Sequence, residues 1–170
     1  SGSLCLVLAG DHVVDNAYAF VHDCKIAASQ AADGKIMTIG IVPTFPASGY
    51  GYIAAGKALA SQNSFVIDRF VEKPDTETAA RYVSEGLLWN SGNFLFRSDA
   101  MIAEMEQRSP DIIEAASAAI AGGKRDLDFF RLDAESFSNS PKISIDYAIM
   151  EKTDRAGVVK ASFGWSDIGA

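Results

Sequence analysis

Short apolar runs alternate with amphipathic helical segments along this chain of 170 residues. Leu4 to Ala9 (LCLVLA) is apolar at every position, which predicts a strand buried on both faces. Asp15 to Ala32 follows with apolar residues at helical spacing, and Gly34 is a stop signal for that helix. Lys35 to Val42 (KIMTIGIV) predicts the next strand. This strand–helix–strand order favours an α/β sheet.

The rest of the chain continues the alternation. Further strands are predicted at Ser64 to Val71 and Gly157 to Phe163, and a strand or strand pair at Leu88 to Phe96. Helices are predicted at Pro74 to Glu85, Ser98 to Gln107, Pro110 to Ala121 and Ser144 to Lys152, and loops at Thr44 to Gly56 and Trp165 to Gly169. No repeat or linker interrupts the pattern, so we expect one domain over residues 1–170. We expect a mixed but mostly parallel sheet flanked by helices, and such sheets bind ligands at the carboxyl ends of their strands.

Composition excludes several classes of protein. The formal net charge is −7, which argues against a nucleic acid partner, because a phosphate backbone requires a basic face. No apolar run approaches the roughly 20 residues of a membrane span. There is no signal peptide, so we expect no membrane partner and a cytoplasmic location. Cys5 and Cys24 are too few for a disulfide scaffold, and we expect both to be buried free thiols.

Two aspartates follow predicted strands. Asp11 comes after the first strand, and Asp167 lies in the loop after the last one. Two carboxylates at one edge of a sheet fit one Mg²⁺ ion that faces a nucleotide's phosphates, because Mg²⁺ takes one or two protein carboxylates and completes its shell with phosphate oxygens and water. A helix N-cap or a turn stays open for either aspartate alone. His12 is placed to touch a ligand, but it lacks the partners of a catalytic triad.

Two further motifs follow strands. Gly49, Tyr50 and Gly51 combine glycines, which let a ligand approach the backbone, with a flat aromatic face. Glu72 and Lys73 put opposite charges at a strand end, and strand alternation is expected to send their side chains to different sides. The carboxylate can then accept sugar hydroxyls while the ammonium meets a phosphate. A plain turn and two solvated charges are the respective alternatives.

Small polar residues interrupt the aromatic strand at Leu88 to Phe96. Asn90 is disfavoured in a strand unless its amide has specific partners, and Gly92 indicates a bulge or a close approach by a ligand. A functional interpretation is favoured here. Ser144 and Asp146 open a late helix, where an N-cap and the helix dipole explain them as well as a ligand does.

In chain order the sequence reads LVLAGDHVV, TIGIVPTFPASGYGYI, FVEKPD, LLWNSGNFLFR, SPDI, SIDYAIMEKT and GWSDIG. This series resembles the mannose-1-phosphate guanylyltransferase family of the nucleotidyltransferases. Each motif alone has low specificity, but the order and spacing of all of them together are specific to the family. The resemblance runs from Leu4 to Gly169. It implies a Rossmann-like fold of the nucleotide-diphospho-sugar transferase type.

The resemblance also implies a reaction in which mannose 1-phosphate and GTP give GDP-mannose and pyrophosphate, with Mg²⁺ as cofactor. It assigns catalytic roles to Asp11, Lys73 and Asp167, metal binding to Asp11 and Asp167, and substrate binding to Gly49, Tyr50, Gly51, Glu72, Lys73, Asn90, Gly92 and Asp146. The substrates are therefore expected to be small molecules.

Two departures from the family pattern limit the resemblance. Ala9 and Gly10 stand where the family usually has Pro-Ala before its Asp-His. The glycine-rich loop with which family members begin, and which grips the GTP phosphates, has no counterpart, so we expect a fragment truncated at its N-terminal side and inactive alone. An open sheet edge would favour a homodimer. The alternatives are a nucleotidyltransferase that makes UDP-, ADP- or dTDP-sugars, and a non-catalytic sugar-nucleotide-binding module.

Overall fold

The structure is a computed structural model that describes residues 2–168. The chain divides into two compact units, one formed by Ser1–Met101 with Thr153–Ala170 and the other by Ile102–Lys152. The expectation of a single domain over residues 1–170 stays a prediction. No helix within residues 2–168 is long and apolar enough to cross a membrane.

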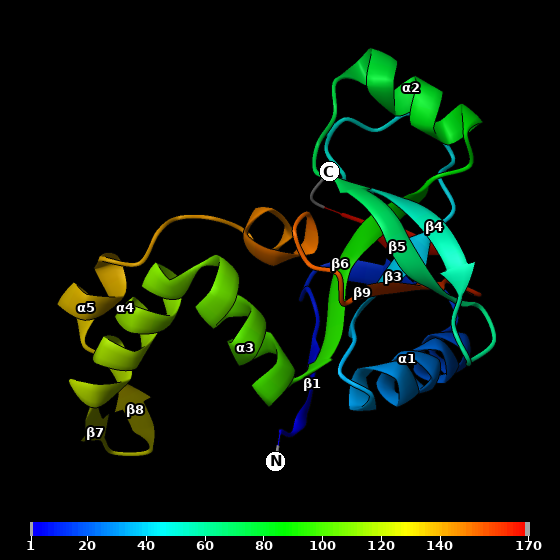
Figure 1. The fold of residues 1–170 in the computed structure, drawn as a ribbon. Helices are drawn as coiled ribbons and strands as arrows, with labels where there is room; N and C mark the ends of the chain where they lie inside the picture. The colour runs from blue at the N-terminus through cyan, green and yellow to red at the C-terminus, as the bar shows by residue number, and fades with distance from the viewer. Residues whose placement is uncertain (1, 169–170) are drawn as a thin grey trace. The chain divides into compact units, whose positions relative to one another are not determined.

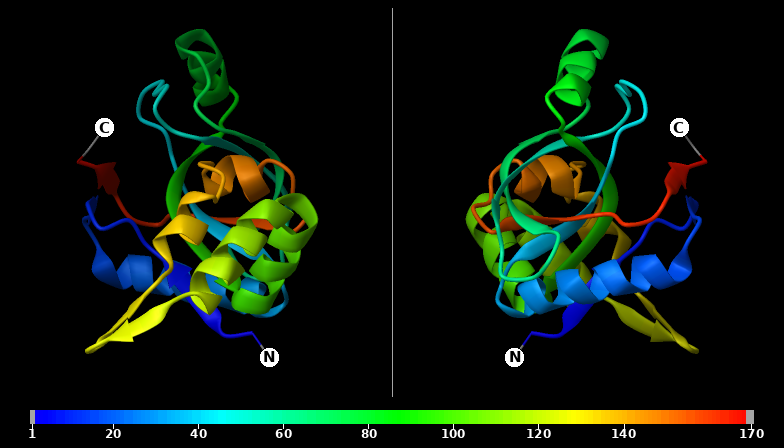
Figure 2. Two further views of the ribbon diagram at one scale, coloured as in Figure 1. Left: turned by 90° about the vertical axis from the view of Figure 1, so that its left-hand side faces the viewer. Right: turned by 90° about the vertical axis from the view of Figure 1, so that its right-hand side faces the viewer.

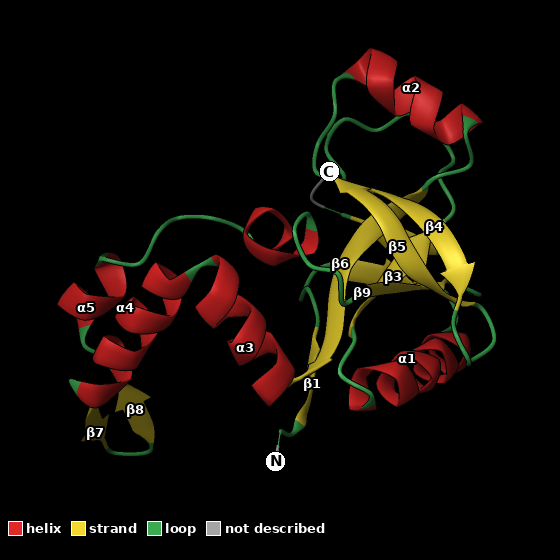
Figure 3. Ribbon diagram, in the orientation of Figure 1, coloured by secondary structure: helices red, strands yellow, loops and turns green. Residues whose placement is uncertain are grey.

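A six-stranded sheet forms the frame of the first unit (Figures 1 and 3). Its strands are β1 (Leu4–Val7), β3 (Ile36–Ile41), β4 (Tyr52–Ala58), β5 (Ser64–Val71), β6 (Leu88–Arg97) and β9 (Ala156–Lys160). They lie in the order β1-β6-β3-β9-β5-β4, and β4 pairs again with β6, so the last five strands close into a ring of pairings. A separate ladder joins β2 (His12–Val14) to β10 (Trp165–Asp167).

The sheet is mixed, as expected, but its predicted parallel majority is wrong. Only β3 and β9 pair in parallel among the described strands of this sheet, and the other pairings are antiparallel. The segment predicted as one loop, Thr44 to Gly56, contains the start of β4, which returns through a hairpin to β5 instead of through a crossover helix. The sequence of β4, YIAAGKA, concealed this strand because alanine, glycine and lysine have low strand propensity.

Two capped helices belong to the first unit. α1 (Ala17–Ala32) packs on β3, β6 and β9, and the Asn16 side chain caps it by accepting a 3.1 Å hydrogen bond from a backbone N–H. α2 (Thr76–Ser84) begins after Asp75, which caps it in the same way at 2.8 Å. The core against α1 and the sheet includes Ala27, Ala31, Met37, Ile39, Tyr52, Trp89 and Val159.

The two outermost strand regions differ from expectation. β1 was expected to be buried on both faces, but among the described strands it pairs with β6 alone and lies at the sheet edge, and Leu4 and Leu6 are nearly half exposed. β2 was not predicted, and residues 165–167 of a predicted loop form β10. Each of these two strands has three residues, too few for a periodic pattern, and each forms because it pairs with the other. Gly169 of that predicted loop lies outside the described residues.

The second unit is mostly helical. α3 (Ser98–Arg108) begins in the first unit and ends in the second, which also holds α4 (Pro110–Ala121), β7 (Lys124–Asp126), β8 (Phe129–Arg131), α5 (Ala134–Ser138) and the π-helical turn η1 (Asp146–Met150). α4 has its predicted bounds, and η1 lies within the helix predicted at Ser144 to Lys152. The hairpin of β7 and β8 and the short α5 were not predicted.

Candidate active site

The β2–β10 ladder brings the two predicted metal-binding aspartates together, and Figure 2 shows the two short strands from both sides. Asp167 is paired with His12 in the antiparallel register, and Asp11 directly precedes β2. One ligand atom of each of these three residues, which we call the metal cluster, lies within 4.8 Å of the others. Asp11 is exposed and the other two are partly buried. The two carboxylates suit a hard cation such as Mg²⁺ that keeps part of its shell for phosphate and water.

Glu72 and Lys73 lie on the same side of the chain, which corrects the expectation that strand alternation separates them. β5 ends at Val71, and Lys73 has a φ of +46°, in the left-handed region. Its Nζ therefore reaches to 3.4 Å from Oε1 of Glu72. The Glu72 side chain is 7% exposed and that of Lys73 59%, so the carboxylate is held inside while the ammonium faces solvent. A non-glycine residue at positive φ costs of order 1–2 kcal/mol and is enriched at functional sites.

Gly51 allows Glu72 and Asn90 to meet at the backbone. A Cβ at Gly51 would lie 2.6 Å from Oε2 of Glu72 and 3.4 Å from Cβ of Asn90. The Gly51 carbonyl accepts a 2.8 Å hydrogen bond from the N–H of Asn90. We call these three residues and Lys73 the sugar group, after their predicted role. A Cβ at position 51 would therefore displace the Glu72 carboxylate, whereas one at Gly49 would meet nothing within 4 Å among the described residues.

A bulge in β6 shapes the Asn90 side of this group. The register between β3 and β6 shifts between Thr38 and Gly40, and Gly92 has a φ of +71°, which confirms the predicted bulge. Oδ1 of Asn90 accepts a 2.7 Å hydrogen bond from the Thr38 hydroxyl and a 3.3 Å bond from the N–H of Gly92. The buried amide therefore has the fixed orientation expected of an asparagine inside a strand.

Tyr50 connects the metal cluster with the sugar group. Its ring packs edge-to-face against Trp89 and Trp165, with centroid distances of 5.0 and 5.5 Å. Trp89 is the neighbour of Asn90 in β6, and Trp165 lies two residues from Asp167 in β10. Burial raises the pKa of the Tyr50 hydroxyl, and the negative charge of Asp167 raises it further. The phenol is therefore neutral and close enough to Asp167 to respond to its charge.

The loop before β4 lines an open hollow of about 340 Å³. It is lined by Phe45, Pro46, Ala47, Ser48, Gly49 and Tyr50. The hydroxyl of the fully buried Tyr52 donates a 2.9 Å hydrogen bond to the Ala47 carbonyl and ties the base of this loop to β4. Phe45 also packs edge-to-face on Trp89, with centroids 5.0 Å apart, so the hollow adjoins the aromatic contacts around Tyr50.

A family model described as "Nucleotidyl transferase" matches residues 1–170. The chain belongs to the nucleotidyl transferase family. It is 48% identical over 168 residues to xanthan biosynthesis protein XanB of Xanthomonas campestris pv. campestris (strain B100), covering 98% of this chain and 35% of that protein. It is 47% identical over 169 residues to a mannose-1-phosphate guanylyltransferase of Sinorhizobium fredii (strain NBRC 101917 / NGR234), covering 99% of this chain and 33% of that protein. The chain thus spans about a third of the length of these curated relatives.

Solved structures agree with this placement. A crystal structure described as mannose-1-phosphate geranyltransferase from Thermus thermophilus matches with a TM-score of 0.84 at 34% identity, over 98% of this chain and 47% of that one. A second, described as mannose-6-phosphate isomerase from Helicobacter pylori, matches with a TM-score of 0.88 at 26% identity, over 98% of this chain and 64% of that one. The resemblance drawn from the motifs and the mixed α/β class are both confirmed.

Asp146 is the predicted substrate-binding residue that belongs to the second unit of this nucleotidyl transferase chain. It begins η1, and its carbonyl accepts a 3.0 Å hydrogen bond from the N–H of Glu151, five residues on. π-Helical turns of this kind are frequent at functional sites. A part in the sugar pocket stays a prediction for Asp146.

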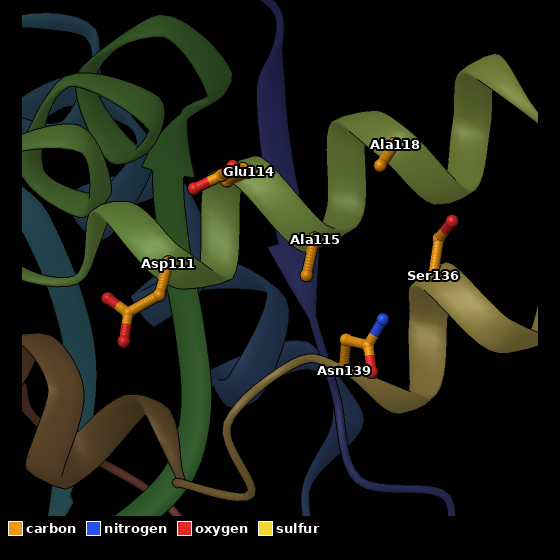
Figure 4. A pocket seen from close by; sticks show the side chains of 6 residues that line it. All are labelled: Asp111, Glu114, Ala115, Ala118, Ser136 and Asn139. Carbon is orange, nitrogen blue, oxygen red and sulfur yellow. The ribbon is translucent and has the colours of Figure 1, made fainter.

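A second hollow, of about 280 Å³, lies between α4 and α5 in the second unit (Figure 4). It is lined by Asp111, Glu114, Ala115, Ala118, Ser136 and Asn139. The two alanines leave space where the helices face each other, because their side chains are short. None of the predicted site residues lines this hollow.

Sequence reasoning missed the aromatic and hydroxyl partners around the candidate site. Trp89 and Trp165 were seen as parts of motifs, without the contacts that place Tyr50 between them. Spacing along the chain does not show which rings meet across a fold. Thr38 offered a usable signal, since a lone hydroxyl in the apolar run KIMTIGIV requires a buried polar partner. The sequence places His12 where it can touch a ligand, and the structure brings it into the metal cluster.

Proposed function

We propose that the protein containing this chain transfers a guanylyl group from GTP to mannose 1-phosphate, giving GDP-mannose and pyrophosphate. Membership of the nucleotidyl transferase family supports the reaction class, and the names of several curated relatives support the base and the sugar. The observation that carries the proposal is the contact of Tyr50 with both tryptophans. It joins a carboxylate pair suited to a divalent cation to a group suited to a sugar phosphate.

The sugar group offers complementary chemistry for mannose 1-phosphate. The Glu72 carboxylate is almost buried, where hydrogen bonds from sugar hydroxyls to a charged acceptor are strong. Lys73 presents an exposed ammonium 3.4 Å from that carboxylate, which suits a phosphate attached to the same sugar. Asn90 and the Gly51 backbone lie beside Glu72, and the hydrogen bond between them fixes their positions.

The metal cluster offers a cation-binding site that suits the negatively charged triphosphate of GTP. Asp11 and Asp167 would hold Mg²⁺, which when bound supplies the positive charge that neutralises the phosphates. An oxygen of the sugar phosphate then attacks the α-phosphorus in line and pyrophosphate leaves, so no side chain has to act as a nucleophile. The residues of this chain contribute by holding the two substrates in register, which is a major source of rate for phosphoryl transfer. A homodimer stays a prediction.

The proposal is tested by the rate of GDP-mannose formation from GTP and mannose 1-phosphate, measured with the purified protein that contains this chain and not with residues 1–170 alone. We expect Asp167→Asn to lower kcat by about 100-fold or more, the loss typical of one removed electrostatic contact in a transition state. We expect Glu72→Gln to raise mainly the KM for mannose 1-phosphate, because it weakens a contact made in the ground state as well as in the transition state.

Glu77→Gln, on the exposed first turn of α2, is the matched control and should change neither kcat nor KM. Preferred transfer from UTP, or equal rates in all variants, would contradict the proposal.

A further inference from the structure

We propose that the imidazole of His12 is a third protein ligand in the metal cluster, and that the site therefore binds Mn²⁺ or Co²⁺ more tightly than Mg²⁺. The inference rests on the proposed function in one respect, that this cluster is where a divalent cation serves the reaction. The three candidate ligand atoms, from Asp11, His12 and Asp167, all lie within 4.8 Å of one another. One ion can therefore reach all three after small side-chain adjustments.

The register of the β2–β10 ladder places His12 on the same face of the ladder as Asp167. Directly paired residues in an antiparallel ladder project their side chains to the same side, and His12 is paired with Asp167. Trp165 lies two residues before Asp167 and so shares that face. This common face explains how histidine and aspartate offer their ligand atoms together.

Packing fixes the orientation of the His12 ring. Trp165 meets it edge-to-face, with centroids 4.9 Å apart and an interplanar angle of 80°. Tyr50 in turn packs against Trp165 at 5.5 Å. A ligand whose ring is held by its neighbours loses little conformational freedom when it binds a metal, which strengthens binding.

The hydrogen bonding of His12 leaves it available to a cation. Nδ1 is shielded from solvent and has no hydrogen-bond partner within residues 2–168. A buried polar atom in that state usually has a structural or functional explanation. A cation is one such explanation, because metals bind neutral imidazole through either ring nitrogen. The alternative is that His12 only packs against Trp165, in which case its nitrogens never contact the ion.

The donor set decides which metals are preferred. Mg²⁺ favours oxygen ligands and keeps several waters, so an imidazole adds little to its affinity. Nitrogen donors favour the later first-row ions, and affinity for a mixed N/O site rises from Mn²⁺ to Co²⁺. A cluster of two carboxylates alone would discriminate less among these ions. Metal preference is therefore the property that His12 controls.

The test is pulsed electron paramagnetic resonance of Mn²⁺ bound to the purified protein. A directly coordinated imidazole gives a ¹⁴N modulation, which must change when the protein is labelled with ¹⁵N-histidine. That comparison needs no substitution, so it does not depend on how a variant folds. We expect the modulation in the wild type and its loss in His12→Asn, with the Mn²⁺ Kd raised by about 10-fold or more and the Mg²⁺ Kd changed far less.

His22 provides the matched control. It is the other histidine of the chain and lies on α1 with a side chain that is 69% exposed. His22→Asn should keep both the modulation and the Mn²⁺ affinity. Absence of a ¹⁴N modulation in Mn²⁺-loaded wild type, its persistence in His12→Asn, or a failure of Mn²⁺ to bind would overturn the inference. Nucleotidyl transfer is assayed separately. A ¹⁴N modulation in a protein that shows no nucleotidyl transfer contradicts only the proposed function. Nucleotidyl transfer by a protein that shows no ¹⁴N modulation contradicts only the role of His12.

Discussion

Gly51 and Gly49 stand two residues apart in the same loop but differ in the space around them. A methyl group at Gly51 would meet Glu72 Oε2 at 2.6 Å, whereas one at Gly49 would meet nothing within 4 Å. We expect Gly51→Ala to displace the Glu72 carboxylate and weaken binding of mannose 1-phosphate, but to lower the free energy of unfolding only slightly, because the clashing atom is the end of a flexible side chain that can move. Gly49→Ala should alter neither, as urea unfolding and ligand titration would show. Equal effects of both substitutions would contradict the close-approach argument.

Lys73 combines a strained backbone with a useful side chain. Its φ of +46° is one that glycine adopts without steric cost. We therefore expect Lys73→Gly to have a free energy of unfolding higher than that of Lys73→Ala by about 1 kcal/mol, since both lack the ammonium and only the first relieves the backbone. Both variants should lose activity to the same extent. Denaturant unfolding measures the free energies of unfolding of both variants. A glycine variant no more stable than the alanine variant would show that the backbone at position 73 carries no strain.

At the scale of elements, the β2–β10 ladder positions both aspartates of the metal cluster. Asp15 holds the two strands together at the end of the ladder away from those aspartates. The Asp15 carboxylate accepts a 2.8 Å hydrogen bond from the N–H of Gly164, whose carbonyl accepts a 3.1 Å bond from the N–H of Asp15. We expect Asp15→Ala to loosen the ladder and weaken Mn²⁺ binding by about three- to tenfold, because about 1 kcal/mol of hydrogen bonding is lost. Asp15→Asn keeps an acceptor oxygen and should retain most of the affinity. The prediction fails if calorimetry gives both variants the wild-type Kd.

The elements that sequence could predict are those whose pattern is carried by their own residues. β5 and α4 have their predicted bounds because an apolar run and a proline-to-glycine helical segment are local signals. β2 and β10 could not be predicted, because three residues become a strand only through a partner about 150 residues away in the chain. β4 was hidden by weak strand formers, and with it the hairpin that makes the sheet largely antiparallel.

The site shows the same division between local and distant information. The motifs predicted residues that lie close together in the structure, since Asp11 lies near Asp167 and Gly51 lies near both Glu72 and Asn90. The contact between Glu72 and Lys73 was mispredicted, because ideal strand alternation was extended two residues beyond the end of β5. Tyr50 as the link between the two groups could not be foreseen, since it depends on tryptophans from two other strands.

At the scale of the whole molecule, an ion pair at the end of β6 ties the chain's first residues to α3 and sets a pH dependence. Hydrogen bonds from the Arg97 guanidinium, then its charge and the N–H groups of Ala100 and Gly2, lower the pKa of Asp99 to about 2. A carboxylate with a lowered folded-state pKa stabilises the fold above its unfolded pKa, near 4, and loses that contribution as the pH falls towards 2. We expect wild type to be more stable than Asp99→Asn at pH 6, with the difference shrinking between pH 4 and 2. Urea unfolding at several pH values tests this, and a difference independent of pH would contradict it.

The central claim is that the metal cluster and the sugar group together bind the diphosphate and the mannose of a nucleotide sugar. Calorimetric titration of the purified protein with GDP-mannose, with and without Mg²⁺, tests it most directly, with UDP-glucose as the control ligand. We expect GDP-mannose to bind, Mg²⁺ to strengthen that binding, and Asp167→Asn to remove the Mg²⁺ effect. If UDP-glucose binds as tightly, or if the protein that contains this chain binds neither ligand although circular dichroism shows it to be folded, the claim is contradicted.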